Sequence, residues 1–268
     1  VKRKEQSKLM VDTLHKVPFE PATNHYEAIQ SYILLWQTMC LEQAPNPFAF
    51  SVGNADRIFE PYRKMSNTDR DTTAALLKHF LVFFNVGDRS WAISQNLIVS
   101  GRDENGNDLT NDTTYALLDA YYDMNLPQPI LSVKLHKNTP DKLYEELGRF
   151  LFTPGCLTPS LFNDDSLYDV LSEAGVDIDD IKDTSIAGCQ EPLIMGKDNA
   201  NTTNSWFNLG KILELTLNDG YSTVTGKKIC DLPSDKTDAL TLLKTVRERF
   251  YKNAEYFCDE MIKSANGA

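Results

Sequence analysis

Two short apolar runs with a helical pattern between them constrain the fold of this chain most strongly. Asn96 to Gly101 reads NLIVSG and predicts a short buried strand. Leu131 to His136 alternates apolar and polar residues, which predicts a second strand with one apolar and one polar face. The segment from Thr110 to Met124, between the two runs, predicts a helix. Strands that alternate with helices indicate an α/β architecture.

Helices are expected over much of the remaining chain. Asn24 predicts the cap of a helix in which apolar residues recur at three- and four-residue spacing as far as Cys40. Thr139-Pro140 predicts another helix start, with proline at the first helical position. The other helices are expected at residues 72–84, 166–175, 205–218 and 239–263. No linker stands out, so residues 1–268 are expected to form one structural unit.

Charge and cysteine spacing exclude several classes of protein. A net charge of −11 disfavours nucleic acid, because a phosphate backbone is bound by a basic surface. No apolar run approaches the roughly 18 residues that cross a membrane, and no signal peptide is recognisable. The five cysteines are widely spaced and include no Cys-x-x-Cys, which is typical of a reducing compartment. We therefore expect a cytoplasmic protein that binds neither nucleic acid nor membrane.

The sequence predicts no metal site. The four histidines are too far apart in sequence for a local pair of ligands. DENGNDLTNDTT, at residues 103–114, is similar to a calcium loop, but its glycine is misplaced and Thr114 stands where glutamate would bind. A solvated loop with a helix cap is favoured instead. For His136, on the polar face of its strand, a hydrogen-bonded structural role is favoured, with catalysis as the alternative.

The stretch AGCQEP, Ala187 to Pro192, places Cys189 two residues before Glu191. One interpretation is a buried thiol beside a surface carboxylate, since free cysteine is among the most buried residue types. In the other, an extended backbone points both side chains to the same side, where an enclosed cavity favours a carboxyl that exchanges protons. Such a carboxyl disfavours a thiolate, and no histidine is local to Cys189. The pair therefore predicts chemistry at a neutral thiol, with Glu191 as acid or base.

Four segments around AGCQEP carry a resemblance to a known enzyme family. They are NLIVSGRDENGNDLTNDTTYALLDAY, LPQPILSVKLHKNTPDKLYEEL, TPSLFND (Thr158 to Asp164) and FNLGKILELTLNDG. In this order they resemble four segments of the glycyl radical enzymes: a strand, turn and helix; a Leu-Pro-x-Pro strand; a Pro-Ser segment; and the helix after the cysteine loop. That group contains pyruvate formate-lyase, the glycerol, diol and choline eliminases and the arylacetate decarboxylases. The resemblance spans about Tyr26 to the C-terminus.

The resemblance implies a fold and a set of site residues. The fold would be part of a ten-stranded α/β barrel of the pyruvate formate-lyase type, with the catalytic cysteine on a finger loop inside. Cys189 would carry a thiyl radical that abstracts hydrogen from the substrate, Glu191 would be the acid or base, and Gln190 would contact the substrate. Pyruvate formate-lyase has two adjacent cysteines in this loop, whereas Gly188 and Gln190 flank Cys189. This departure argues against acyl transfer.

Two further departures concern the substrate. Phe48 takes the position of a histidine found in the glycerol and diol dehydratases, and NANTTNSW, at residues 199–206, replaces their His-Asp pair. Groups that bind hydroxyls are therefore missing. Phe48 is expected to contact the substrate in a more apolar pocket, and the alternative is that it packs against the barrel wall.

Length is the largest departure, because family members are much longer and end in an Arg-Val-x-Gly-aromatic loop that holds the radical. Residues 1–268 are therefore expected to be a partial glycyl radical enzyme domain, without the N-terminal part and the C-terminal glycine-radical domain, and inactive in isolation. No cofactor is expected to bind directly. The resemblance implies that an activating enzyme with an iron–sulfur cluster and S-adenosylmethionine installs the glycyl radical outside this chain. It also implies a small-molecule substrate and a homodimer of the full-length enzyme.

The expected activity is radical cleavage of a C–O, C–N or C–C bond, of the eliminase or decarboxylase type. One alternative is a lyase like formate C-acetyltransferase. The other is a non-catalytic remnant or a fragment that binds a partner.

Overall fold

The computed structural model describes residues 2–42, 49–85, 94–198 and 208–229 and, further along, 247–248, 250–256, 258–259 and 263. The chain divides into two compact units, residues 1–204 and 205–268. The expectation that residues 1–268 form one partial domain stays a prediction.

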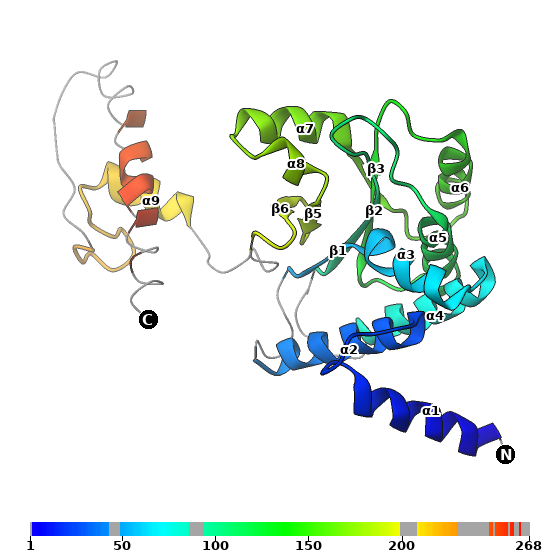
Figure 1. The fold of residues 1–268 in the computed structure, drawn as a ribbon. Helices are drawn as coiled ribbons and strands as arrows, with labels where there is room; N and C mark the ends of the chain where they lie inside the picture. Colours follow the sequence, from blue (N-terminus) through cyan, green and yellow to red (C-terminus); the bar gives the residue numbers. More distant parts are fainter. Residues whose placement is uncertain are drawn as a thin grey trace. The chain divides into compact units, whose positions relative to one another are not determined.

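A parallel four-stranded sheet organises the first unit (Figure 1). Its strands follow one another in the order β1 (Ser51–Asn54), β2 (Asn96–Ser100), β3 (Ile130–Leu135) and β4 (Ser160–Asn163). Each neighbouring pair is parallel, with Asn96 opposite Ile130. The strands predicted at residues 96–101 and 131–136, and the α/β fold class, are confirmed.

Eight helices are described in the first unit: two precede β1 and the others lie between successive strands. They are α1 (Lys2–Lys16), α2 (His25–Glu42), α3 (Ala55–Ser66), α4 (Arg70–Phe83), α5 (Asp112–Met124), α6 (Asp141–Leu151), α7 (Asp164–Glu173) and α8 (Ile178–Ile181). Of these, α2, α4, α5, α6 and α7 confirm predicted helices, with ends that differ by about two residues. Pro140 is the N-cap of α6 and so precedes the helical position predicted for it by one residue.

The sequence patterns do not predict α1, β1 or α3. The α1 segment is polar along most of its length, so no apolar periodicity marks it as a helix. Pro61 lies inside α3, where a proline usually indicates that a helix ends. The strand β1 has four residues, SVGN, of which one is glycine. Each of these elements therefore lacks the local signal that identified its neighbours.

Side-chain caps explain where predicted helices begin. Asn24 Oδ1 accepts a hydrogen bond from the backbone N–H of Glu27 at 2.9 Å, so the predicted cap of α2 is confirmed. At α5, Asn111 Oδ1 accepts from the N–H of Thr114, and Thr114 Oγ1 accepts from the N–H of Asn111. This reciprocal capping box sets the start of the helix that connects β2 to β3.

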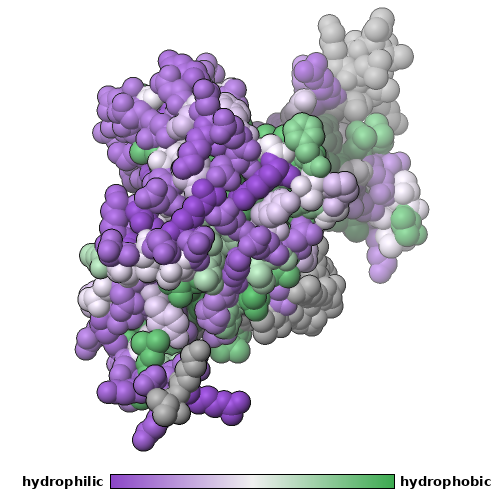
Figure 2. Space-filling model, turned by 90° about the vertical axis from the view of Figure 1, so that its right-hand side faces the viewer, coloured by the Kyte–Doolittle hydropathy of each residue, from purple (hydrophilic) through white to green (hydrophobic). Residues whose placement is uncertain are grey.

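One face of the sheet is apolar and packs against helices. Leu97 and Val99 of β2, with Leu131 and Val133 of β3, are fully buried in a hydrophobic core to which α2 to α6 also contribute. Figure 2 views the side of the molecule on which α5 and α6 lie, and its surface is mainly hydrophilic. The helices therefore form an outer layer that separates this apolar face from water.

The opposite face of the sheet is mainly polar, with Ile98 as an apolar residue among polar ones, and it is covered by a β-hairpin. Strands β5 (Thr184–Ala187) and β6 (Glu191–Ile194) pair in antiparallel fashion, and β5 contacts β1 and β2. Asn96, Ser132 and Lys134 lie on the polar face and have no exposed surface. The polar half of the alternation predicted for β3 is thus buried beneath a segment much further along the chain.

The second unit contains α9 (Leu209–Leu217), whose N-cap Asn208 accepts the N–H of Lys211 through Oδ1 at 2.9 Å. This helix confirms the described part of the helix predicted at residues 205–218. Of the helix predicted at residues 239–263, the described residues are helical, and the remainder lies outside the described residues. Asn253 Nδ2 donates to Thr216 Oγ1 at 3.0 Å and joins this segment to α9.

Candidate active site at the Cys189 turn

Cys189 lies at the tip of the hairpin. The turn consists of Gly188, Cys189 and Gln190, between the paired residues Ala187 and Glu191. The Cys189 side chain is exposed, so the interpretation as a buried thiol is wrong. Gly188 has φ +54°, a left-handed conformation that glycine adopts without a steric penalty. The prediction that Cys189 lies in a loop is confirmed.

Glu191 folds back onto the turn that carries Cys189. Its Oε2 accepts hydrogen bonds from the backbone N–H groups of Cys189, at 2.9 Å, and Gln190, at 3.0 Å. The two residues are therefore neighbours, but the backbone at Cys189 is a turn and not the extended strand that the sequence predicted. Glu191 is also exposed. The described residues thus do not form the enclosed cavity on which the predicted proton exchange depended.

Gly188 leaves the space that this carboxylate occupies. A Cβ atom built on Gly188 would lie 2.6 Å from Glu191 Oε2 and 3.2 Å from Ala49 Cβ. The first distance is well inside van der Waals contact, so any larger residue at position 188 would displace the carboxylate or the turn. The glycine of AGCQEP is therefore favoured by its positive φ, and it also leaves the space in which the Glu191 carboxylate caps the turn.

The structure says less about the other two predicted site residues. Phe48 lies outside the described residues, but Ala49, which follows it, is buried beside Gly188. Gln190 is exposed and donates its backbone N–H to Glu191. The substrate-binding roles of Phe48 and Gln190 stay predictions.

Lys134 holds the base of the hairpin against the sheet. Its side chain is fully buried, and Nζ donates to the carbonyl oxygens of Lys182, at 3.2 Å, and Thr184, at 3.1 Å. The buried carboxylate of Asp164 lies 3.9 Å from Nζ. Burial lowers the pKa of Lys134 to about 8, although the nearby Asp164 opposes that change. The buried Lys134 amine therefore anchors the start of β5 to the sheet.

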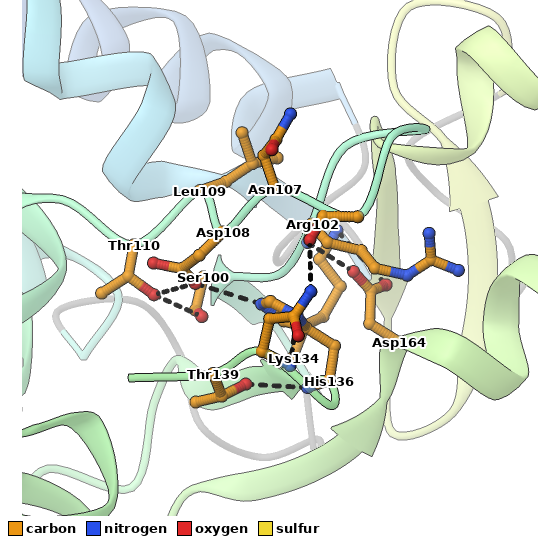
Figure 3. A network of polar contacts seen from close by, with 12 residues as sticks. Ser100, Arg102, Asn107, Asp108, Leu109, Thr110, Lys134, His136, Thr139 and Asp164 are labelled. Atoms are coloured by element: carbon orange, nitrogen blue, oxygen red, sulfur yellow. Dashed lines mark hydrogen bonds and ion pairs between the residues drawn. The ribbon is translucent and has the colours of Figure 1, made fainter. Parts of the chain in front are cut away.

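A polar network lies at the carboxyl ends of β2 and β3 (Figure 3). His136 Nε2 is 3.1 Å from Asp108 Oδ1, which also accepts from Thr110 Oγ1 at 2.8 Å. Thr110 Oγ1 is in turn 2.8 Å from Ser100 Oγ. His136 Nδ1 accepts from the backbone N–H of Asn138 at 3.3 Å. Both ring nitrogens have partners within the protein, so the hydrogen bonding predicted for His136 is confirmed. Its structural role, as opposed to a catalytic one, stays a prediction.

Two buried carboxylates join this network to its surroundings. Asp56 Oδ2 accepts from the N–H of Ser100, at 2.8 Å, and from Thr114 Oγ1, at 2.6 Å. Burial raises the pKa of Asp56, and these hydrogen bonds offset part of the rise. Asp164 Oδ2 accepts from the N–H of Arg102 at 2.8 Å. Asp56 therefore connects α3 to the end of β2 and to α5. Asp164 connects the start of α7 to the residues that follow β2.

Neither a metal-binding cluster nor a helix able to cross a membrane occurs among the residues that the structure describes. In the polar loop at residues 103–114, Asp103 Oδ1 accepts from the backbone N–H groups of Asn105, at 2.9 Å, and Asn107, at 2.8 Å. This arrangement is an Asx-type turn, in which the aspartate stabilises its own loop. It matches the polar loop that the sequence favours over a calcium site.

Sequence reasoning does not identify Asn96 and Lys134 as residues of the site. A signal was nevertheless present, because a lysine within an apolar strand is costly to bury unless its ammonium group has partners. The sequence could not supply those partners. They are carbonyl oxygens of residues 182–188, which reach the strands only when the hairpin docks.

Comparison with known proteins places the sheet and the hairpin in a family. A model described as pyruvate formate lyase-like matches residues 1–268. The trans-4-hydroxy-L-proline dehydratase of Clostridioides difficile is 29% identical over 97% of this chain and 35% of its own length. The indoleacetate decarboxylase of Tractidigestivibacter scatoligenes is 26% identical over 85% of this chain and 28% of its own length. The crystal structure of a glycyl radical enzyme from Archaeoglobus fulgidus has a TM-score of 0.77 at 26% identity, over 94% of this chain and 35% of that one.

The fold and these relatives define the class as glycyl radical enzymes. Within it, the chain belongs to the pyruvate formate lyase-like family. The similarity of fold confirms that the parallel sheet is part of an α/β barrel of the pyruvate formate-lyase type. The chain spans about a third of the length of the relatives it matches. That the Cys189 turn is the catalytic finger loop stays a prediction.

Proposed function

We propose that this chain carries the reactive thiol and the acid or base of a glycyl radical enzyme that cleaves a bond in a small organic substrate. The type is eliminase or decarboxylase, with a C–O, C–N or C–C bond broken. One observation supports the proposal most directly: an exposed Cys189 at a hairpin tip, with the Glu191 carboxylate hydrogen-bonded to the same turn. Membership of the family supplies the radical chemistry that such a thiol needs.

The proposed reaction is a set of hydrogen-atom transfers at Cys189. The hydrogen atom of its S–H group passes first to a glycyl radical held elsewhere in the protein, which leaves the unpaired electron on sulfur. The sulfur then takes a hydrogen atom from a substrate C–H bond, so the S–H bond reforms and the unpaired electron moves to carbon. After bond cleavage, the product radical takes the hydrogen atom back from Cys189. No external oxidant or reductant is consumed.

Glu191 is proposed to move the proton that accompanies bond cleavage. A leaving group that departs as an anion must gain a proton, and a substrate radical with an adjacent hydroxyl group must lose one. Both hydrogen bonds to the turn use Oε2. The proton exchanged with the substrate would therefore be carried on Oε1. Positioned acid–base catalysis of this kind typically contributes about 10²–10⁴ in rate.

Phe48 and Gln190 are proposed to contact the substrate. Gln190 is exposed and follows the thiol directly, and Ala49, next to Phe48, is buried beside the turn. An aromatic residue there makes the pocket more apolar than one lined by histidine. The alternative, that Phe48 packs against the barrel wall, predicts that Phe48→Leu leaves KM unchanged.

Partners and location follow from the proposed chemistry. The glycyl radical would be installed by an activating enzyme that uses an iron–sulfur cluster and S-adenosylmethionine, and the complete enzyme would be a homodimer. Cys156, Cys189 and Cys258 are free thiols, which supports a reducing, cytoplasmic location. Acyl transfer, as in formate C-acetyltransferase, is disfavoured because no second cysteine adjoins Cys189.

The test uses the protein expressed from its complete reading frame and treated with its activating enzyme. Electron paramagnetic resonance measures the glycyl radical, and product formation is measured on the same samples. Cys189→Ser is expected to retain the radical and lose all turnover. Glu191→Gln should retain the radical and turn over about 10²–10⁴ times more slowly. If Cys189→Ser keeps its turnover, Cys189 is not the reactive thiol. If Glu191→Gln keeps near-normal turnover, the carboxylate has a structural role.

A further inference from the structure

The peptide group between Gly188 and Cys189 is held at both of its polar atoms. Its oxygen, the Gly188 carbonyl, accepts a hydrogen bond from Asn96 Nδ2 at 3.1 Å. Its nitrogen, the Cys189 N–H, donates to Glu191 Oε2 at 2.9 Å. The two side chains come from different places, since Asn96 begins β2 of the sheet and Glu191 begins β6 of the hairpin.

A peptide group is planar, so two hydrogen bonds at its opposite edges restrict the orientation of the whole group. The Cys189 Cα atom belongs to that plane, and the Cα–Cβ bond leaves it in a direction set by the backbone. Fixing this peptide therefore restricts where the thiol can be placed. Asn96 is fully buried and Gly188 is buried, so water does not compete for this hydrogen bond.

The remaining anchors of the hairpin lie further from the thiol. Lys134 Nζ holds the carbonyls of Lys182 and Thr184, and Ser51 Oγ lies 2.6 Å from Ser185 Oγ. These contacts fix the base and the middle of β5. Among the described residues, Asn96 is the sheet residue whose side chain hydrogen-bonds to the turn itself.

We propose that Asn96 is a positioning residue for Cys189: together with Glu191 it clamps the Gly188–Cys189 peptide and so aims the thiol. Glu191 then has a role that is separate from proton transfer, because its carboxylate also completes the clamp. The consequence for catalysis rests on the proposed function of Cys189, whereas the clamp itself does not.

Hydrogen exchange of the ¹⁵N-labelled chain tests the clamp without any activity. In the wild-type chain, the Cys189 and Gln190 amides should exchange more slowly than the same amides in the unfolded chain. Asn96→Ala should accelerate both amides by about fivefold, since a single hydrogen bond makes a modest net contribution. Ser132→Ala is the matched control, because Ser132 is equally buried on the same face and its hydroxyl makes no hydrogen bond within the described residues. It should leave both amides unchanged.

Two substitutions at Glu191 separate the clamp from proton transfer. Glu191→Gln keeps a side-chain oxygen that can accept from the Cys189 N–H, so the slow exchange should persist although the proposed acid or base is lost. Glu191→Ala should lose both the slow exchange of the Cys189 amide and the proposed acid or base.

Gly188→Ala perturbs the clamp without touching the sheet, because its Cβ would lie 2.6 Å from Glu191 Oε2. It should accelerate the Cys189 amide even if Asn96→Ala does not fold.

Turnover of the activated full-length protein then tests whether the clamp serves catalysis. Asn96→Ala should lower kcat about a hundredfold, with KM and the radical signal unchanged, because a small misplacement of a reacting group is costly. Wild-type exchange in both Asn96→Ala and Gly188→Ala overturns the clamp. Faster exchange with normal kcat overturns the positioning role. If the wild-type protein itself shows no turnover, the proposed function of Cys189 fails and the exchange data still decide the clamp.

Discussion

On β2 and β3, Leu97 and Val133 point into the helix-covered core, whereas Asn96 and Lys134 alternate with them and point at the hairpin. All four side chains are fully buried. The apolar pair gains free energy from leaving water, with little dependence on direction. The polar pair loses hydration and recovers it through hydrogen bonds that must be correctly oriented. The apolar face therefore contributes stability without specifying direction, whereas the polar face contributes less stability and specifies where the hairpin docks.

The largest effect is expected on the apolar face. Leu97→Ala removes a fully buried side chain from the core and should lower the free energy of unfolding by about 2–5 kcal/mol. Urea unfolding followed by circular dichroism measures the change. Val82→Ala, on the half-exposed side of α4, is the control and should cost far less. A loss below about 1 kcal/mol for Leu97→Ala would show that the core tolerates a cavity there.

A pH-dependent effect is expected on the polar face. The pKa of Lys134 is lowered to about 8 by burial, whereas an unfolded chain has a lysine pKa of about 10.4. Between these values the unfolded chain binds more protons, so the free energy of unfolding should rise with pH. The rise due to Lys134 should be about 2–3 kcal/mol from below pH 8 to above pH 10.5. Below pH 8 the cost of burying the charge is fully present.

Lys134→Met isolates that contribution because it removes the titrating group. The difference in unfolding free energy between the wild-type chain and Lys134→Met should change by this amount across the window. Other groups that titrate in the same range, such as the tyrosines, cancel in the difference. A difference that is flat with pH would mean that Lys134 is ionised with an ordinary pKa.

A smaller effect is expected for the contact between Ser51 and Ser185, whose hydroxyls are 2.6 Å apart and fully buried. Ser51→Ala should cost about 1–2 kcal/mol, because it leaves the Ser185 hydroxyl buried without its partner. The double variant with Ser185→Ala should recover part of that loss, since no serine hydroxyl is then buried without its partner. The recovery is incomplete because the Gly53 N–H, which donates to Ser51 Oγ at 3.2 Å, still loses its acceptor. A double-mutant cycle in urea measures the coupling. Purely additive losses would show that the two hydroxyls do not interact.

The smallest effect is expected for Ser132, a polar residue on the same face that anchors no described part of the hairpin. The Ser132 hydroxyl is buried and makes no hydrogen bond within the described residues. Ser132→Ala should therefore be neutral or stabilising by up to about 1 kcal/mol. The midpoint of thermal unfolding measures this change. A clear destabilisation would indicate an ordered water molecule that the hydroxyl binds.

Local signals made part of the fold predictable. The apolar run at 96–101, the alternation at 131–136 and the cap at Asn24 each lie within a few residues, and all three are confirmed. By contrast, β1 and α3 carry a glycine and a proline in positions that usually indicate breaks, and tertiary packing overrides them. A strand alternation also cannot reveal what will cover its polar side.

The candidate site was likewise only partly predictable from the sequence. The spacing of Cys189 and Glu191 was sufficient to predict that they lie together, but not that a backbone turn and a carboxylate cap bring this about. Asn96 and Lys134 were placed in strands from the sequence, yet their roles depend on carbonyl groups of the distant hairpin. Contacts between residues so far apart in the sequence can be identified only once the tertiary structure is known.

The clamp on the Gly188–Cys189 peptide acts on the main chain and leaves the torsion about the Cys189 Cα–Cβ bond outside its control. Rotation between staggered positions of that bond moves the sulfur atom by roughly 3 Å while the backbone stays fixed. A thiol that must exchange a hydrogen atom first with one partner and then with another needs this kind of movement. If Cys189 is the reactive thiol proposed above, rotation about this one bond would carry the sulfur between its two partners without any displacement of the loop.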